Sequence, residues 1–159
     1  LGNPIHQAAA SGGGNLTWTN NMPNTLPTGT LGERLAADYL KSRGYRILGR
    51  NFFFCVLGGP KIAEVDIIAK RRDAFAFVEV KTIKANSKYL AQDKVNETKK
   101  WKIAKAAEMW LIKNKVPLDV KWQIDVIAVE LLPDDRPKIF QKILGPRFKL
   151  SHFENIGCY

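Results

Sequence analysis

The alternation of apolar and polar positions predicts a helix followed by three strands in the first half of the chain. Apolar residues recur at helical spacing after Thr30, and Gly44 ends that pattern. Three mainly apolar segments follow and predict strands at Tyr45–Leu57, Lys61–Lys70 and Ala74–Thr82. Because only the short polar turn "KRRD" separates the last two, we expect them to form an antiparallel hairpin.

The second half of the chain predicts a long helix and further strands. A polar loop over residues 83–93 precedes a helix at Lys94–Lys115, and a strand follows at Lys121–Leu131. The segment Lys138–Leu144 is interpreted as a further strand. The resulting αβββαβ order is typical of an α/β fold in which helices flank a mixed β-sheet.

The first thirty residues differ from the rest of the chain in composition. Residues 1–30 contain no Lys, Arg, Asp or Glu and are rich in Asn, Gly, Thr and Pro, so all 25 basic and 15 acidic residues lie in 31–159. A segment of this composition cannot bury a core of its own. We therefore predict an arm or linker at 1–30 and one folded domain at 31–159.

The net charge and the apolar content limit the classes of function. A net charge of +10 indicates a polyanionic partner, with nucleic acid first and an acidic membrane surface second. No run of 18 apolar residues could cross a membrane, and the first residues lack the pattern of a signal peptide. Neither Cys55 nor Cys158 has a Cys or His at zinc-ligand spacing, so we expect free thiols and a cytoplasmic location.

Charged side chains interrupt the apolar strands of the predicted hairpin. In "AFAFVEVK", Glu79 and Lys81 are two residues apart and share a face; in "AEVDII", Glu64 and Asp66 do the same. If these faces match, three carboxylates meet one lysine, and two like charges about 4 Å apart repel by roughly 4 kcal/mol. A divalent cation would offset the excess, and oxygen ligands favour Mg²⁺ or Mn²⁺. Together with the basic charge, this predicts metal-assisted phosphodiester hydrolysis with Lys81 beside the reacting water.

Asp66 followed thirteen residues later by Glu79-Val80-Lys81 resembles the core motif of PD-(D/E)XK nucleases. The wider match is carried, in this order, by the segments "LGERLAADYLKSRGYRIL", "RNF", "AEVDIIA", "FVEVKT", "IDVIAVE" and "HFEN". Over residues 31–157 the chain resembles the YraN-type family (UPF0102) of uncharacterised proteins, which is related to archaeal Holliday-junction resolvases. The resemblance implies a restriction-endonuclease-like fold.

The resemblance also implies a set of site residues and a substrate. Asp66, Glu79 and Glu33 would bind Mg²⁺ or Mn²⁺, and Lys81 would be the catalytic lysine. The expected activity is that of a metal-dependent endonuclease on DNA, possibly branched or structured, in a protein that could be a homodimer. Ile83 departs from the family by replacing a basic residue that usually follows the motif lysine.

Glu33, Glu79 and Lys81 also have purely structural explanations. Thr30 and Glu33 have the spacing of a capping box at a helix N-terminus. Glu79 and Lys81 could form only an ion pair. Under these explanations the protein would be a non-catalytic nucleic-acid-binding module with a degenerate nuclease fold.

Five further polar residues lie outside this set. Lys94, Lys99 and Lys100 could bind phosphates or form a solvated helix face, and Lys99 aligns with a basic position of the family. Asp125 is expected on a strand, satisfied near the site, and His152 in a structural motif near the C-terminus.

Overall fold

The structure is a computed structural model that describes residues 6–9, 27–56, 59–84 and 96–158. Within these described ranges nine elements follow one another: β1 (His6–Ala9), α1 (Thr28–Ser42), β2 (Arg46–Cys55), β3 (Lys61–Arg71), β4 (Ala74–Lys84), α2 (Glu97–Lys113), β5 (Trp122–Leu131), α3 (Lys138–Leu144) and β6 (Phe148–Cys158). Among these residues no helix is long and apolar enough to cross a membrane.

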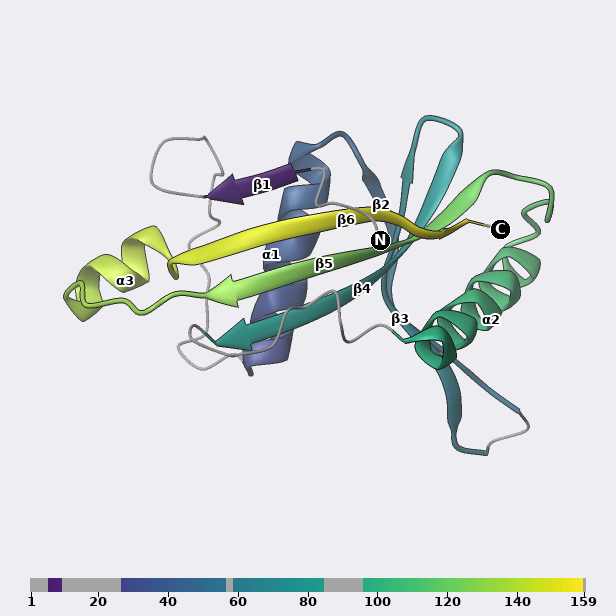
Figure 1. Cartoon of the computed structure of the whole chain (residues 1–159), viewed down its shortest axis with the longest axis horizontal. Coiled ribbons are helices and arrows are strands. Elements are labelled where there is room, and N and C mark those ends of the chain that lie inside the picture. The colour runs from purple at the N-terminus through teal and green to yellow at the C-terminus, as the bar shows by residue number, and fades with distance from the viewer. Residues whose placement is uncertain (1–5, 10–26, 57–58, 85–95, 159) are drawn as a thin grey trace.

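The strands form a single mixed sheet, as the sequence predicts. Its strand order is β1-β6-β5-β4-β3-β2 (Figure 1). β4 and β5 run parallel, whereas every other neighbouring pair is antiparallel. The parallel pair requires a crossover connection, which α2 provides. The α/β fold class is confirmed, and the arrangement agrees with a restriction-endonuclease-like core.

Alternate residues of β4 face two different helices. Phe75 and Phe77 pack against Trp110 of α2. Ala76 and Val78 belong instead to the buried cluster around α1. A strand buried on both faces in this way carries apolar residues at successive positions, which explains the nearly continuous apolar run of β4. A charged side chain in this strand is therefore unusual on either face.

The C-terminal part of the chain differs from the prediction. The segment Lys138–Leu144 is a helix and not a strand. The last strand of the sheet is β6, which the sequence did not predict beyond a structural motif around His152. β6 pairs with β5 along most of its length and carries β1 on its other edge.

Two parts of the predicted arm have regular structure. His6–Ala9 forms the edge strand β1, and α1 begins at Thr28. The remainder of the arm, residues 1–5 and 10–26, lies outside the described residues. Cys55 is a free thiol, as predicted.

Candidate active site

The candidate site lies where β3 separates from β4. The two strands pair from the hairpin turn as far as Ile67 and Val78, while β3 continues to pair with β2 beyond that point (Figure 1). Asp66 is the first residue after the last pair with β4. Its Oδ2 accepts a hydrogen bond of 2.7 Å from the Val80 backbone N–H. A side-chain carboxylate therefore occupies the place of a backbone acceptor at the fork between the strands.

Glu79 is a buried carboxylate that contacts two lysines. It is 3% exposed and lies on the same face of β4 as Phe77, toward α2. Lys81 donates to its Oε1, and the Lys99 ammonium lies 3.0 Å from Oε2. Oε2 is nevertheless buried without a hydrogen bond of good geometry. A buried oxygen in this state is costly unless it has a further partner.

Burial first, and then the negative charge of Glu79, raise the pKa of Asp66 to about 6. The hydrogen bond from Val80 and the positive charge of Lys99 act against this shift, whereas Glu33 adds to it. Asp66 is therefore electrostatically coupled to both other acidic residues predicted for the site. Two carboxyls in a shared, poorly solvated place are typical of functional sites.

Glu33 reaches this region because α1 packs very closely on β4. A β-carbon at Gly32 would lie 2.9 Å from the β-carbon of Thr82, so only glycine allows this approach. Glu33 then forms an ion pair of 3.5 Å with Arg50 of β2. Arg50 pairs across the sheet with the neighbour of Asp66 and was not among the predicted site residues.

The capping-box interpretation of Glu33 is wrong. The N-cap of α1 is Pro27, and no side chain caps this helix end. Thr30 lies within the first turn of α1, so Glu33 is too far along the helix to be the N3 residue of a capping box. The helix begins at Thr28, two residues before the predicted N-cap, so its first turn belongs to the predicted arm.

The three predicted phosphate-binding lysines have different places. Lys99 lies at the site, where its ammonium is 3.0 Å from Glu79 Oε2. It belongs to the first turn of α2, and the Asn96 side chain caps this helix by accepting from the Lys99 backbone N–H at 2.9 Å. Lys100 points instead to Glu97, at 2.8 Å. Lys94 lies outside the described residues.

Two acidic residues do not join the cluster in the way the sequence suggested. Glu64 forms an ion pair of 3.3 Å with Lys61 and is more than a third exposed, so the expected group of three strand carboxylates contains only two. Asp125 lies on the other face of the sheet from Glu79, beside Val78 in the register. There it accepts from Gln123, bonds His152 Nε2 at 3.1 Å and accepts from the Asn155 backbone N–H.

The donor set fits a hard divalent cation that is held partly by a substrate. No group of three His, Cys, Asp or Glu side chains at metal-binding distance occurs in the described ranges. Mg²⁺ typically takes one or two carboxylates and fills its other positions with water and phosphate oxygens. Asp66 and Glu79 match that requirement in chemical type, and the Lys99 ammonium lies 3.0 Å from Glu79 Oε2.

Comparison with known proteins identifies the family. Residues 32–129 match the family described as "Uncharacterised protein family UPF0102". A UPF0102 protein of Trichlorobacter lovleyi is 44% identical over 112 residues, which are 70% of this chain and 83% of the relative. A UPF0102 protein of Alkaliphilus oremlandii is 33% identical over 129 residues, which are 80% of this chain and 94% of the relative.

The matched range begins at Gly32 and includes the hairpin, α2 and most of β5, so it contains every residue placed at the fork. The chain therefore belongs to the YraN-type family UPF0102.

Proposed function

We propose that the protein is a metal-dependent nuclease that hydrolyses phosphodiester bonds in DNA, with Asp66 and Glu79 as ligands of Mg²⁺ or Mn²⁺. One observation carries the proposal: the buried Glu79 carboxylate, the half-buried Asp66 carboxylate and Lys81 converge where the paired strands separate. Burial and the charge of Glu79 raise the pKa of Asp66 to about 6, so Asp66 is mainly an ionised acceptor at neutral pH. The bound cation would polarise the phosphate and make a water molecule more acidic.

The side chains have separate roles in this proposal. Glu79 positions the Lys81 ammonium through its Oε1, where that donor can orient the attacking water and stabilise negative charge on the phosphate. Lys99 lies at Oε2, the atom that the cation would take, so we expect its ammonium to move to a phosphate oxygen when the site is filled. Arg50 holds Glu33 near Asp66 as a third, more distant acceptor.

The substrate and the setting follow from charge and from family. A net charge of +10 favours a nucleic acid as partner. We further propose branched or structured DNA as the substrate and a homodimer as the assembly, both by analogy with the resolvases to which this family is related. We propose a cytoplasmic location because the cysteines are expected to be free thiols.

A second candidate function is a nucleic-acid-binding module without catalysis. One observation favours it: Lys81 and Lys99 already contact the two oxygens of Glu79, so its charge is compensated without a metal. The two candidates differ in what Lys81 does, because a transition-state donor affects the rate far more than it affects binding.

A cleavage panel with Lys81→Ala tests the proposal. Duplex, flap, four-way-junction and single-stranded DNA, and RNA, are incubated with Mg²⁺ or Mn²⁺. We expect cleavage of DNA by the unmodified protein and a loss of about 100-fold or more in Lys81→Ala. The matched control is Lys105→Ala, because Lys105 pairs with Glu108 on α2 and has no contact with the site carboxylates.

DNA binding is measured in the same panel. Lys81→Ala should lower the affinity by no more than one phosphate contact would, with a change in the salt slope of about 1. A protein that binds DNA tightly and cuts nothing with either metal would support the binding module instead. Equal cleavage by Lys81→Ala and the unmodified protein would remove Lys81 from the site.

A further inference from the structure

Lys99 reaches from the first turn of α2 across to Glu79 of β4. Its ammonium lies 3.0 Å from Oε2 of that carboxylate. Lys105, on the same helix, pairs instead with Glu108, which is three residues away. Local pairs of that kind are typical of a solvated helix face. Lys99 differs from Lys105 because its partner is a buried carboxylate of another element.

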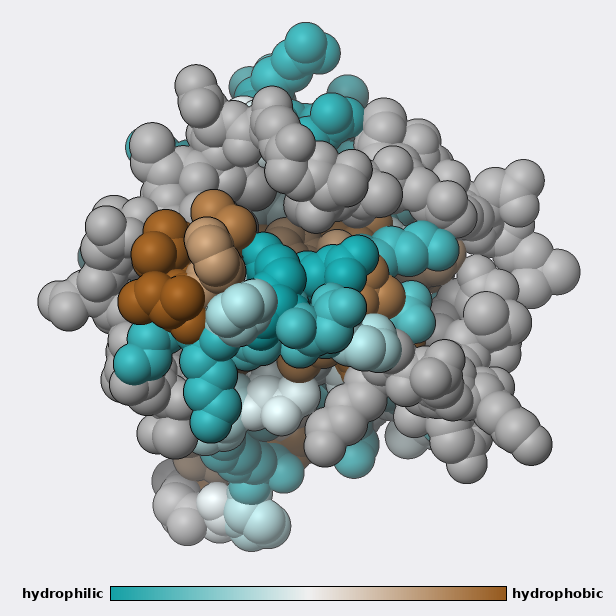
Figure 2. Space-filling model, turned by 90° about the vertical axis from the view of Figure 1, so that its left-hand side faces the viewer, coloured by the Kyte–Doolittle hydropathy of each residue, from teal (hydrophilic) through white to brown (hydrophobic). Residues whose placement is uncertain are grey.

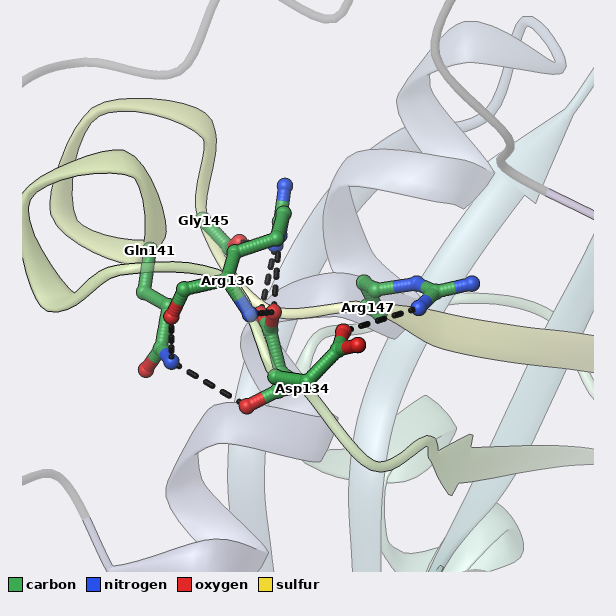
Figure 3. Close-up of polar contacts among 6 residues, drawn as sticks. Asp134, Arg136, Gln141, Gly145 and Arg147 are labelled. Carbon is green, nitrogen blue, oxygen red and sulfur yellow. Dashed lines mark hydrogen bonds and ion pairs between the residues drawn. The ribbon is translucent and has the colours of Figure 1, made fainter.

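An ion pair elsewhere in the molecule shows how a carboxylate is fully satisfied. Arg136 donates from Nε to one oxygen of Asp134 at 2.7 Å and from Nη2 to the other at 2.6 Å (Figure 3). The same guanidinium donates to the Gly145 carbonyl at 2.8 Å. This pair lies at the α3 end of the molecule, where a band of hydrophilic residues borders an apolar patch (Figure 2). Because both oxygens of Asp134 have hydrogen bonds of good geometry, this pair has a structural role.

The contact between Lys99 and Glu79 is less complete. Lys81 donates to Oε1, whereas Oε2 is buried without a hydrogen bond of good geometry and meets Lys99 only as an ion-pair partner. The Lys99 side chain is 32% exposed, so its ammonium can leave the carboxylate for solvent or for another anion. A buried oxygen that is held in this way can still accept a stronger partner.

The charge of Lys99 competes with any cation at the candidate site. It lies beside Oε2 of Glu79, and it also acts to lower the pKa of Asp66, so its field reaches both carboxylates. A divalent cation repels an ammonium group twice as strongly as a monovalent cation does at the same distance. Binding of a divalent cation to the free protein therefore requires Lys99 to move away, and this lowers the affinity.

A nucleic acid offers Lys99 a place to which it can move. Phosphate groups accept charge-assisted hydrogen bonds from an ammonium group. When the Lys99 ammonium contacts a phosphate, Glu79 loses one of the charges that compensate it, and its carboxylate becomes a stronger ligand. The cation and the phosphate favour the same movement of Lys99, so each of them helps the other to bind.

We propose that Lys99 couples metal binding to DNA binding, because it occupies Glu79 in the free protein and releases this carboxylate when it contacts a DNA phosphate. This inference rests on the proposed function and adds an order to it. The free protein holds its metal weakly, and the metal site is complete only on DNA.

Calorimetry of Mn²⁺ binding to the free protein is the first test. Lys99→Met removes the ammonium and keeps an unbranched side chain that suits a helix. The cap of α2 uses the backbone N–H of Lys99 and is preserved. We expect Lys99→Met to bind Mn²⁺ about tenfold more tightly than the unmodified protein does. Lys99→Gln, a second variant without the charge, should behave in the same way, and the control Lys105→Met should leave the affinity unchanged.

DNA binding is the second test. A labelled duplex with phosphorothioate linkages, which resist hydrolysis, is titrated with a chelator and with Mn²⁺. The ratio of the two affinities measures the coupling, because metal changes the affinity for DNA by the same factor by which DNA changes the affinity for metal. We expect this ratio to be about tenfold lower in Lys99→Met than in the unmodified protein. Lys105→Met shows how far Mn²⁺ screens the phosphates in general, and its ratio should match that of the unmodified protein.

The direction of the change separates the inference from a structural role of Lys99. If this lysine only holds Glu79 in place, Lys99→Met should bind Mn²⁺ equally or more weakly, and that result would overturn the coupling. An equal ratio of DNA affinities in Lys99→Met and the unmodified protein would overturn it as well. Cleavage by the unmodified protein would still support the nuclease in both cases. If no variant binds Mn²⁺ and Mn²⁺ leaves every DNA affinity unchanged, the proposed function itself is contradicted.

Discussion

Two groups of buried acidic residues lie on opposite faces of the same sheet, and they differ in how far their oxygens are satisfied. Asp125, on the α1 face, is fully buried and bonds Gln123, His152 and a backbone N–H. Glu79, on the α2 face, is almost as deeply buried, yet Oε2 has no hydrogen bond of good geometry. Asp125 is held by fixed neighbours, whereas the partners of Glu79 are the Lys81 and Lys99 ammonium groups, which a bound ligand could displace.

The two groups also differ in how their partners are arranged. His152 is enclosed by Tyr39 and Tyr45, whose rings meet it edge-on, and Tyr45 donates to Glu154. Burial raises the pKa of both tyrosines, so both hydroxyls stay protonated; that of Tyr45 donates to Glu154, whereas that of Tyr39 is buried without a hydrogen-bond partner among the described residues. These partners come from α1, β5 and β6 and join three elements together. The partners of Glu79 are lysines whose ammonium groups are partly exposed and can move.

The largest expected effect comes from removing the satisfied carboxylate. Asp125→Ala leaves His152 and the Asn155 N–H without their buried acceptor, so the free energy of unfolding should fall by about 3–5 kcal/mol. Urea unfolding measures this. Asp38→Ala is the control, because Asp38 pairs only with the exposed Lys41 and should change stability by about 0.5 kcal/mol or less. A small loss in Asp125→Ala would contradict the structural role assigned to this group.

The next effect concerns metal binding at the unsatisfied group. If Mn²⁺ binds the native protein at Asp66 and Glu79, a concentration 100 times the dissociation constant should add about 2.7 kcal/mol to the free energy of unfolding. Thermal unfolding with and without Mn²⁺ measures it. Asp66→Asn should remove the gain, while Asp125→Asn should keep it. Stabilisation that persists in Asp66→Asn would move the metal away from the fork.

Removal of the Asp66 charge should stabilise the metal-free protein. Because the pKa of Asp66 is raised to about 6, the native state binds more protons than the unfolded state, and stability is lost as pH rises through about 6. Asp66→Asn keeps an acceptor for the Val80 N–H and cannot ionise. Above pH 7 it should therefore be more stable than the unmodified protein by about 1–2 kcal/mol.

The measurement for Asp66 is a series of urea-unfolding curves from pH 4 to pH 8 in the presence of a chelator. The two proteins should converge toward pH 4 and separate progressively up to about pH 6, above which the difference in stability should stay constant. Parallel curves across the series would show that Asp66 is solvated like an ordinary carboxylate.

The smallest expected change in stability is that of Glu33→Gln. The ion pair with Arg50 is partly exposed, so its loss should cost about 0.5 kcal/mol or less. If Glu33 assists the site as a third acceptor, the affinity for Mn²⁺ measured by calorimetry should still fall. An unchanged Mn²⁺ affinity would leave Glu33 a structural residue.

Sequence patterns identified Asp66, Glu79 and Lys81 because charged residues are unusual in strands that are otherwise apolar. Glu79 and Lys81 interrupt an apolar strand, and Asp66 does so on its neighbour, so the alternation of residues was sufficient to group them. Glu64 was misplaced because the match of faces was assumed along the whole hairpin, whereas β3 parts from β4 before that residue. A local pattern does not reveal where two strands separate.

The C-terminal region was harder to predict for a different reason. His152 and Glu154 are polar residues inside β6. They form hydrogen bonds with Asp125 and Tyr45, which are distant in sequence, so no local pattern explains them. Lys138–Leu144 has an apolar pattern that a short strand and a short helix can share. Its apolar face is exposed, so no burial pattern could separate the two.

Because Gly32 has no side chain, α1 lies close to β4, and this distance influences how strongly Glu33 raises the pKa of Asp66. Any larger residue there would meet Thr82 and would have to move α1 away from β4. Glu33 follows directly in the chain and would move with the helix, which would weaken its electrostatic influence on Asp66. A single methyl group at residue 32 could thus tune the site while every donor atom keeps its chemical identity.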